Sequence, residues 1–91
     1  MDRRLPPVAA RAPDGETLTE YDKAMVPTYL RLLDADHAGA DWCDVATQVL
    51  GLEASSDREG ARETHHSHLA RARWLAAQGY RELVWQTPAK P

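Results

Sequence analysis

The chain has 91 residues, of which 43% are hydrophobic, with 14 acidic residues against 11 lysines and arginines and a single cysteine. A chain of this length forms one small domain and buries only about 60–65% of the surface that its unfolded form exposes, which leaves little room for an enclosed catalytic cleft. No run of about 18 apolar residues is present to span a membrane, no apolar stretch typical of a secretory signal follows the first arginines, and no cysteine pair can form an internal disulfide. We therefore expect a cytoplasmic protein that is not an enzyme.

The first 17 residues contain three prolines and one glycine but few large apolar side chains. Such a segment cannot bury enough surface to offset the entropy of ordering, so residues 1–17 are predicted to form a flexible arm. The domain itself is predicted over residues 18–86, with a short tail at 87–91. Because Ala, Leu, Glu and Arg are plentiful and β-branched residues are sparse, its composition favours helix.

A first helix is predicted to begin at Thr19, with Asp22 three residues later in the capping-box position. Apolar side chains then recur at helical spacing as far as Leu33. Pro27 lies inside this pattern, so it should either kink the helix or open a second helical segment. Gly39 is the predicted stop.

A second, short helix is predicted after Asp41, a candidate N-cap. Its apolar residues follow at i, i+3, i+4 and i+7, and they are Trp42, Val45, Ala46 and Val49. Gly51 comes directly after this pattern, as expected of a residue that ends a helix.

The third predicted helix is the longest and runs from about residue 57 to residue 78. Ser56 and Glu59 match the capping-box pattern at its start, and Gly79 ends it before a short closing segment at residues 80–85. The stripe that we expect to be buried consists of Ala61, His65, His68, Leu69, Ala72, Leu75 and Ala76.

Together these elements predict an all-α fold, a three-helix helix-turn-helix variant with a long third helix and a short C-terminal helical segment. The turn from Gly51 to Ser56 has about six residues, whereas a helix-turn-helix usually joins its helices by about 3–4. This pattern alone does not separate an extended helix-turn-helix from any other three-helix bundle.

Two motifs carry a resemblance to a known family: Gly39-Ala40-Asp41-Trp42 and Gly79-Tyr80-Arg81-Glu82-Leu83. Over about residues 19–85 the chain resembles the RovC-like DNA-binding domain family, which implies a helix-turn-helix variant that acts in transcription control. In members that bind DNA, the domain follows a separate N-terminal domain, and its turn and third helix are rich in Arg and Lys.

The chain departs from that pattern in its charge. Residues 34–63 carry eight acidic residues against two arginines, a net charge of −6. The acids at the turn and the start of the third helix are Glu53, Asp57, Glu59 and Glu63. DNA affinity comes largely from neutralising phosphates with Lys and Arg, so we expect this acidic face not to bind DNA; the plain alternative is an ordinary solvated surface.

As a lone, acidic member of this family, the chain resembles the antiactivators that repress transfer of conjugative elements under quorum-sensing control. That resemblance implies a transcriptional activator as the partner, bound through its N-terminal domain, and no nucleic acid, membrane or metal partner. We expect the chain to be a monomer or a weak dimer.

The partner-binding residues are predicted among aromatic side chains and their neighbours, because Trp and Tyr dominate protein interfaces. They are Tyr29, Leu32, Arg73, Trp74, Tyr80 and Trp85. Trp74 lies on the opposite side of the third helix from its alanines, so it either meets the partner or packs under Trp85. The plain alternative for Arg73 and the nearby Arg71 is a solvated side chain.

No cofactor, metal or catalytic residue is expected. His65 and His68 are three residues apart on the helix, but a structural zinc site needs four protein ligands, and only His37 and Cys43 could add to them. Cys43 has no marked base or orienting residue beside it, so it is not expected to be a nucleophile.

Two other functions stay open. In the first, a DNA-binding regulator would place Arg3, Arg4 and Arg11 in the minor groove and Arg58 and Arg62 in the major groove. In the second, the chain would be an antitoxin-like or structural helical module with an unrelated partner.

Overall fold

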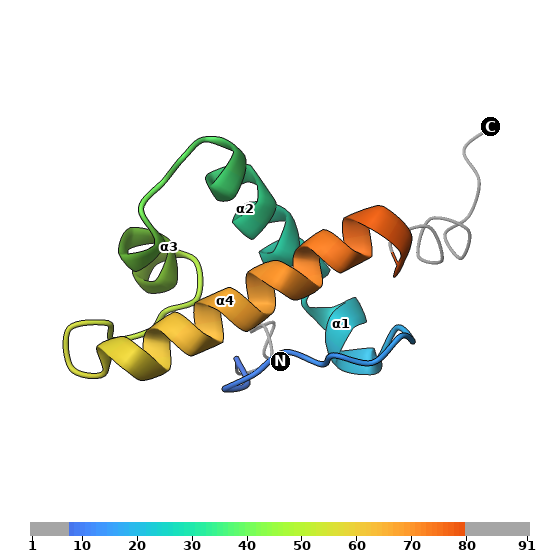
Figure 1. The fold of residues 1–91 in the computed structure, drawn as a ribbon, viewed down its shortest axis with the longest axis horizontal. Coiled ribbons are helices and arrows are strands. Elements are labelled where there is room, and N and C mark those ends of the chain that lie inside the picture. The colour runs from blue at the N-terminus through green and yellow to red at the C-terminus, as the bar shows by residue number, and fades with distance from the viewer. Residues whose placement is uncertain (1–7, 80–91) are drawn as a thin grey trace, which may run out of the picture.

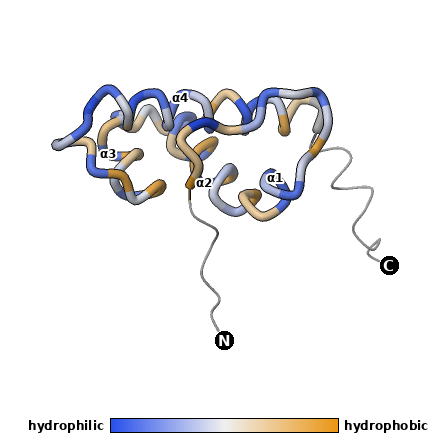
Figure 2. The backbone as a smooth tube through the Cα atoms, turned by 90° about the horizontal axis from the view of Figure 1, so that it is seen from below, coloured by the Kyte–Doolittle hydropathy of each residue, from blue (hydrophilic) through white to orange (hydrophobic). Residues whose placement is uncertain are grey.

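The computed structural model describes residues 8–79, which form four α-helices and a closing π-helical segment and contain no strand. The elements are α1 Glu20–Ala24, α2 Val26–His37, α3 Trp42–Gln48, α4 Arg58–Trp74 and η1 Leu75–Gly79. The long α4 crosses the molecule, and α1, α2 and α3 lie on one side of it (Figures 1 and 2). The predicted all-α fold with one long helix is confirmed. In the part of the chain described, no helix is long and apolar enough to span a membrane.

The first predicted helix is two helices. Thr19 caps α1 and Asp22 completes the predicted capping box, but the helix stops at Met25 and α2 begins with Pro27 in its first turn. A proline in a helix interior removes one hydrogen bond and clashes with the preceding turn, whereas in a first turn its missing N–H costs nothing. The second of the two predicted outcomes for Pro27 is therefore the one observed.

Two glycines end helices in the left-handed region. Gly39 has a φ of 78° and follows α2, and Gly51 has a φ of 69° and follows α3. Beyond Gly39 the Ala40 N–H donates to the Ala35 carbonyl at 3.0 Å, a closing bond of the Schellman type that uses a carbonyl left free by the helix end. Both predicted stops are confirmed. The connection from α3 to α4 spans residues 49–57, longer than the six-residue turn predicted.

The predicted Ser56–Glu59 capping box is wrong. Asp57 is the N-cap of α4, and its carboxylate accepts a hydrogen bond from the Gly60 N–H at 3.0 Å. The chain turns just before the helix, where the N–H groups of Ser56 and Asp57 both donate to the Glu53 carbonyl. That turn directs the Ser56 hydroxyl back to Glu53, so the next residue is the one that caps.

The core lies where α4 packs on α2 and α3, and its largest fully buried apolar side chains are Tyr29, Met25 and Leu32. Its buried residues are Met25, Tyr29, Leu32, Val45, Leu50, Leu69, Ala72 and Leu75. The buried stripe predicted for the long helix is confirmed except at Ala76, which is exposed. Beyond Trp74 the backbone is π-helical, so the α-helical period that placed Ala76 in the stripe no longer applies.

Residues 8–17, predicted as part of a flexible arm, lie against α1 and α4 (Figure 1). The Ala9 N–H donates to the Tyr21 hydroxyl and the Ala12 N–H to the Ser67 hydroxyl, both at 3.0 Å, and Ala12 is buried. Backbone hydrogen bonds to residues distant in the sequence hold this segment in place. A prediction based on hydrophobicity takes no account of such hydrogen bonds. Residues 1–7 lie outside the described part of the chain.

Candidate functional site

The end of the molecule at α3 and the start of α4 presents the acidic surface predicted from the sequence. We use this name for Glu53, Asp57, Glu59 and Glu63, all of which are exposed. Glu59 and Glu63 lie one turn apart on α4, and Asp57 caps it. Carboxylates therefore stand where the start of a recognition helix would meet DNA.

The basic residues beside the acidic surface are partly engaged elsewhere. The Arg58 guanidinium lies 5.2 Å from the centre of the Trp42 ring and donates to the Cys43 sulfur at 3.4 Å. Arg11 approaches Glu63 at 3.8 Å, an exposed pair that is worth little in free energy. Arg62 is exposed. This leaves the region acidic on balance, as the charge of residues 34–63 indicates.

Two of the predicted partner-binding residues belong to the core instead. Tyr29 and Leu32 are each 1% exposed, and the Tyr29 hydroxyl donates to the Asp22 carboxylate at 2.9 Å. Neither side chain can contact a partner unless α2 and α4 separate. Periodicity marked both as apolar positions, but it could not tell an interface from the interior.

Two further predicted residues, Arg73 and Trp74, lie near the surface. Arg73 is exposed and pairs with Asp36 at 2.8 Å, which joins α4 to α2. Trp74 is half-buried, packs against the core, and lies beneath the Arg71 guanidinium, 4.0 Å from the ring centre. Tyr80 and Trp85, the last two predicted, lie outside the described residues.

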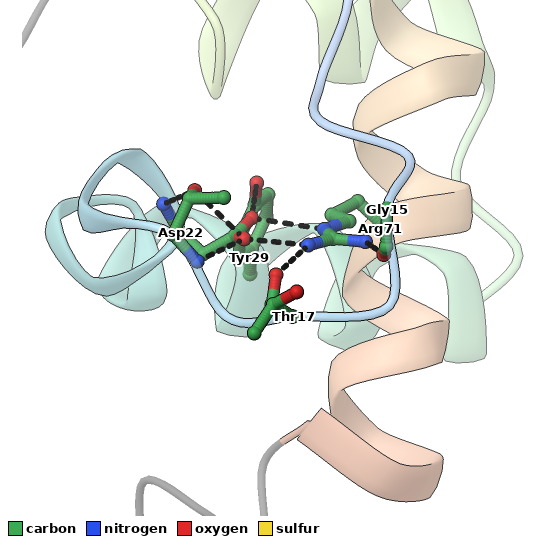
Figure 3. Close-up of polar contacts among 6 residues, drawn as sticks. Gly15, Thr17, Asp22, Tyr29 and Arg71 are labelled. Carbon is green, nitrogen blue, oxygen red and sulfur yellow. Dashed lines mark hydrogen bonds and ion pairs between the residues drawn. The ribbon is translucent and has the colours of Figure 1, made fainter.

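A buried ion pair that sequence reasoning missed connects α1, α4 and the N-terminal segment. The Arg71 guanidinium donates to both carboxylate oxygens of Asp22, at 3.0 and 2.7 Å, and the two side chains are 3% and 0% exposed. Arg71 also donates to the carbonyls of Gly15 and Thr17 (Figure 3). The expectation that Arg71 is solvated is therefore wrong, because its partner is 49 residues away in the sequence.

The charge on Asp22 is stabilised by its hydrogen bonds. Burial by itself would raise the pKa of Asp22, but hydrogen bonds from Arg71, Thr19 and Tyr29 outweigh it and hold the pKa below the ordinary value. The hydrogen bond to Asp22 raises the pKa of Arg71, and burial beside this carboxylate raises the pKa of Tyr29. The cluster is a fully paired, charged part of the interior.

His68 extends this cluster and is fully buried. Its Nδ1 lies 2.7 Å from the Thr64 carbonyl and its Nε2 lies 2.7 Å from the Tyr21 hydroxyl. Since a carbonyl only accepts, the neutral ring carries its proton on Nδ1 and accepts from Tyr21 at Nε2. Burial lowers the pKa of His68, so its role is to pair polar groups of the interior.

The other histidines do not assemble a metal site. His65 is buried and His66 exposed, and residues 8–79 contain no group of three or more His, Cys, Asp or Glu side chains that could hold a metal ion. Burial lowers the pKa of His65, and its Nδ1 is buried with no hydrogen-bond partner within that range.

A comparison with protein families places the chain beside a known family. A family model described as a type VI secretion system (T6SS) transcription-factor DNA-binding domain of RovC matches residues 1–84. No curated protein and no solved structure matches the chain.

Proposed function

The chain belongs to the RovC DNA-binding domain family, and on that premise we propose that it regulates transcription by binding a transcriptional activator instead of DNA. The family is one of transcription-factor domains, which indicates a regulator rather than an enzyme. The family match does not supply a binding partner, so the activator is the new element of the proposal. The observation that carries it is the acidic surface at the start of α4.

Four exposed carboxylates on that surface oppose DNA binding. An approaching phosphate meets Glu59 and Glu63 on successive turns, while Arg58 is stacked on Trp42. Like charges within about 8 Å of each other repel at physiological salt, and there is no compensating release of counterions from phosphate. The same surface suits a basic protein surface, because complementary charge steers association.

In this proposal the chain is an antiactivator. It occupies the surface of an activator's N-terminal domain on which the activator's own related domain normally packs, and so blocks activation of conjugative-element transfer genes. The described part of the chain is helical, as expected of such a domain, and the start of α4 carries exposed acids in place of the Arg and Lys expected of DNA-binding members. It can therefore compete for the protein contact without contributing affinity for DNA.

Titration calorimetry tests the proposal. The purified chain is titrated with the N-terminal domain of each transcriptional activator encoded on the same genetic element. We expect saturable one-to-one binding with a Kd of roughly micromolar or below. Glu59→Lys, which reverses one charge of the acidic surface, should weaken binding, while Glu16→Lys, which reverses an exposed acid outside α4, is the matched control. Heats of dilution alone with every activator domain would contradict the proposal.

DNA binding is the second candidate, and the family match favours it. Arg62 on α4 and the exposed Arg11 would supply contacts, with Arg58 released from Trp42 and with Arg3 and Arg4 from outside the described residues. A dimer would be needed to read two half-sites. A salt-dependent shift of duplex DNA at sub-micromolar chain would support this function, and no shift at roughly 50 mM salt would exclude it.

A further inference from the structure

A groove with a volume of about 530 Å³ lies between α4 and the segment that links α2 to α3. We name it the Trp42 groove. Its walls include Asp36, Ala40, Trp42, His65, Leu69 and Arg73. It is separate from the acidic surface, which lies at the start of α4, and from the buried Asp22–Arg71 pair.

His65, in the wall of the groove, has a buried polar atom with no partner among the described residues. His65 is 6% exposed, and its Nδ1 is buried and makes no hydrogen bond to the described residues. Such an atom has lost its water and gained nothing in return, which is costly in a folded protein. A hydrogen-bonding group brought by a ligand would remove that cost.

Aromatic and apolar side chains form much of the rest of the wall, beside Asp36, His66 and Arg73. The half-buried Trp42 ring lies 6.1 Å from the His65 ring, and Arg58 covers it at 5.2 Å. Leu69 and Val45 also line the groove. A concave site whose walls combine aromatic and apolar side chains with a few polar ones fits an inserted side chain better than it fits a flat surface or a duplex.

The charge around the groove indicates which kind of residue can accompany the inserted side chain. Asp36, Ala40 and Trp42 line one edge of the groove, and the stretch to which they belong, residues 34–44, carries four exposed acids and no lysine or arginine. On the opposite edge Arg73 is already paired with Asp36 at 2.8 Å. The acids are Asp34, Asp36, Asp41 and Asp44. An occupant with basic residues next to its apolar side chain complements this edge.

We propose that the Trp42 groove takes up an apolar side chain of the activator, flanked by lysine or arginine, with a hydrogen bond to His65. The inference rests on the proposed function and adds to the acidic surface a second contact with the same partner. It accounts for two features that the fold itself does not need, namely the His65 nitrogen, which has no partner within residues 8–79, and the half-buried Trp42.

The test compares two single substitutions in the full chain, each titrated with the activator domain that binds in the calorimetry described above. Ala40→Arg fills the groove and repels a basic occupant. Ala38→Arg adds the same charge two residues away, at an exposed position that does not line the groove. We expect Ala40→Arg to raise the Kd roughly tenfold or more, as for loss of an interface anchor, and Ala38→Arg to change it by less than about twofold.

His65→Leu separates binding from folding. It keeps the side-chain volume and removes the unpaired nitrogen, so the midpoint of thermal unfolding of the free chain should rise while the Kd for the activator also rises. If His65 only packed the core, His65→Leu would lower the stability of the chain and its affinity for the activator together. That result would overturn the role of His65 in binding.

The outcomes distinguish the two proposals. If the activator domain binds and neither Ala40→Arg nor His65→Leu weakens it, the groove inference is wrong while the proposed function stands. If no activator domain binds the unaltered chain, both are wrong. Backbone amide shifts at Ala40 and Trp42 that grow with the concentration of the chain alone would identify a second copy as the occupant and overturn the inference.

Discussion

Asp22 serves two structures at once. It completes the capping box of α1 with Thr19, and it is the ion-pair partner of Arg71 on α4. Each of its oxygens accepts more than one hydrogen bond: Oδ1 from Tyr29 and Arg71, and Oδ2 from Thr19 and Arg71. Buried charges are tolerated only when they are satisfied in this way. The carboxylate therefore ties a local helix start to the tertiary packing.

Replacing one partner of this pair should be far more damaging than replacing one partner of an exposed pair. Asp22→Asn leaves the Arg71 charge buried without a counter-ion and should lower the free energy of unfolding by about 3 kcal/mol or more. Asp36→Asn, in the exposed pair with Arg73, is the matched control and should cost less than about 1 kcal/mol. Urea denaturation at pH 7 measures the free energy of unfolding of both variants. Equal losses would show that burial does not determine how much an ion pair contributes to stability.

The buried histidines and Asp22 should make the fold acid-sensitive. The pKa values of His65 and His68 lie below 6.5 in the folded chain, so the unfolded chain binds more protons as the pH falls through this range. The free energy of unfolding should have its full value above about pH 6.5 and decrease below it. Protonation of Asp22 should cause a further decrease below about pH 4.

Urea midpoints measured between roughly pH 7.5 and pH 3.5 check this prediction. His65→Leu removes one of the responsible groups, so it should reduce the loss above about pH 5 and leave the loss below about pH 4 unchanged. A midpoint that rises as the pH falls from about 7.5 to 5.5 would contradict the assignment.

At the scale of the element, α4 is a long helix whose buried side is partly polar. Thr64, His65, His68 and Arg71 are buried beside Leu69 and Ala72, and the side chains of His68 and Arg71 are paired. Figure 2 shows hydrophilic residues along much of α4. Since polar groups in the interior need specific partners, α4 is positioned by hydrogen bonds as well as by apolar contact.

The start of α4 offers a direct test of its cap. Asp57→Ala removes the carboxylate that accepts from the Gly60 N–H and should destabilise the chain by about 1 kcal/mol. Ser56→Ala, at the position that the sequence pattern had suggested, should change stability by less than about 0.5 kcal/mol. Thermal denaturation of the two variants decides between the residues, and a larger loss for Ser56→Ala would restore the original assignment.

At the scale of the whole molecule, charge is divided between regions. The acids are concentrated in residues 34–63, which form the end of α2, all of α3 and the start of α4, while residues 64–91 carry a net charge of +3. The overall net charge of −3 conceals this division. Such a distribution determines which surfaces can approach a polyanion.

Reversing the charge at the start of α4 should restore affinity for DNA. Glu59→Lys combined with Glu63→Lys changes the net charge from −3 to +1 and places two cations on adjacent turns of α4. We expect measurable, salt-dependent binding of duplex DNA where the unaltered chain shows none.

The control for this variant is Glu16→Lys combined with Glu20→Lys, which changes two exposed acids outside α4 and gives the same net charge. The dependence of the binding constant on salt concentration, measured by fluorescence anisotropy, separates the two. Equal affinity of both double variants would mean that total charge matters and the position on α4 does not.

The sequence by itself determined what depends on neighbouring residues. The Thr19–Asp22 capping box, the Asp41 cap, the stops at Gly39 and Gly51 and most of the buried stripe of α4 follow from local hydrogen bonding and from the helical period. The exposure of the four acids also followed, because charged side chains are seldom buried unless they are paired. Where two local signals competed, as at Ser56 and Asp57, the preceding turn decided between them.

Only the tertiary structure decided which residues meet across long stretches of chain. Asp22 and Arg71 are 49 residues apart, and Arg71 reaches Gly15 and Thr17 from even farther. It was likewise the packing of α2 on α4 that placed Tyr29 in the interior and left the Trp42 groove open. The physical reason is that a periodic pattern fixes the side of a helix on which a residue lies, whereas the partner on that side depends on how the helices are arranged in space.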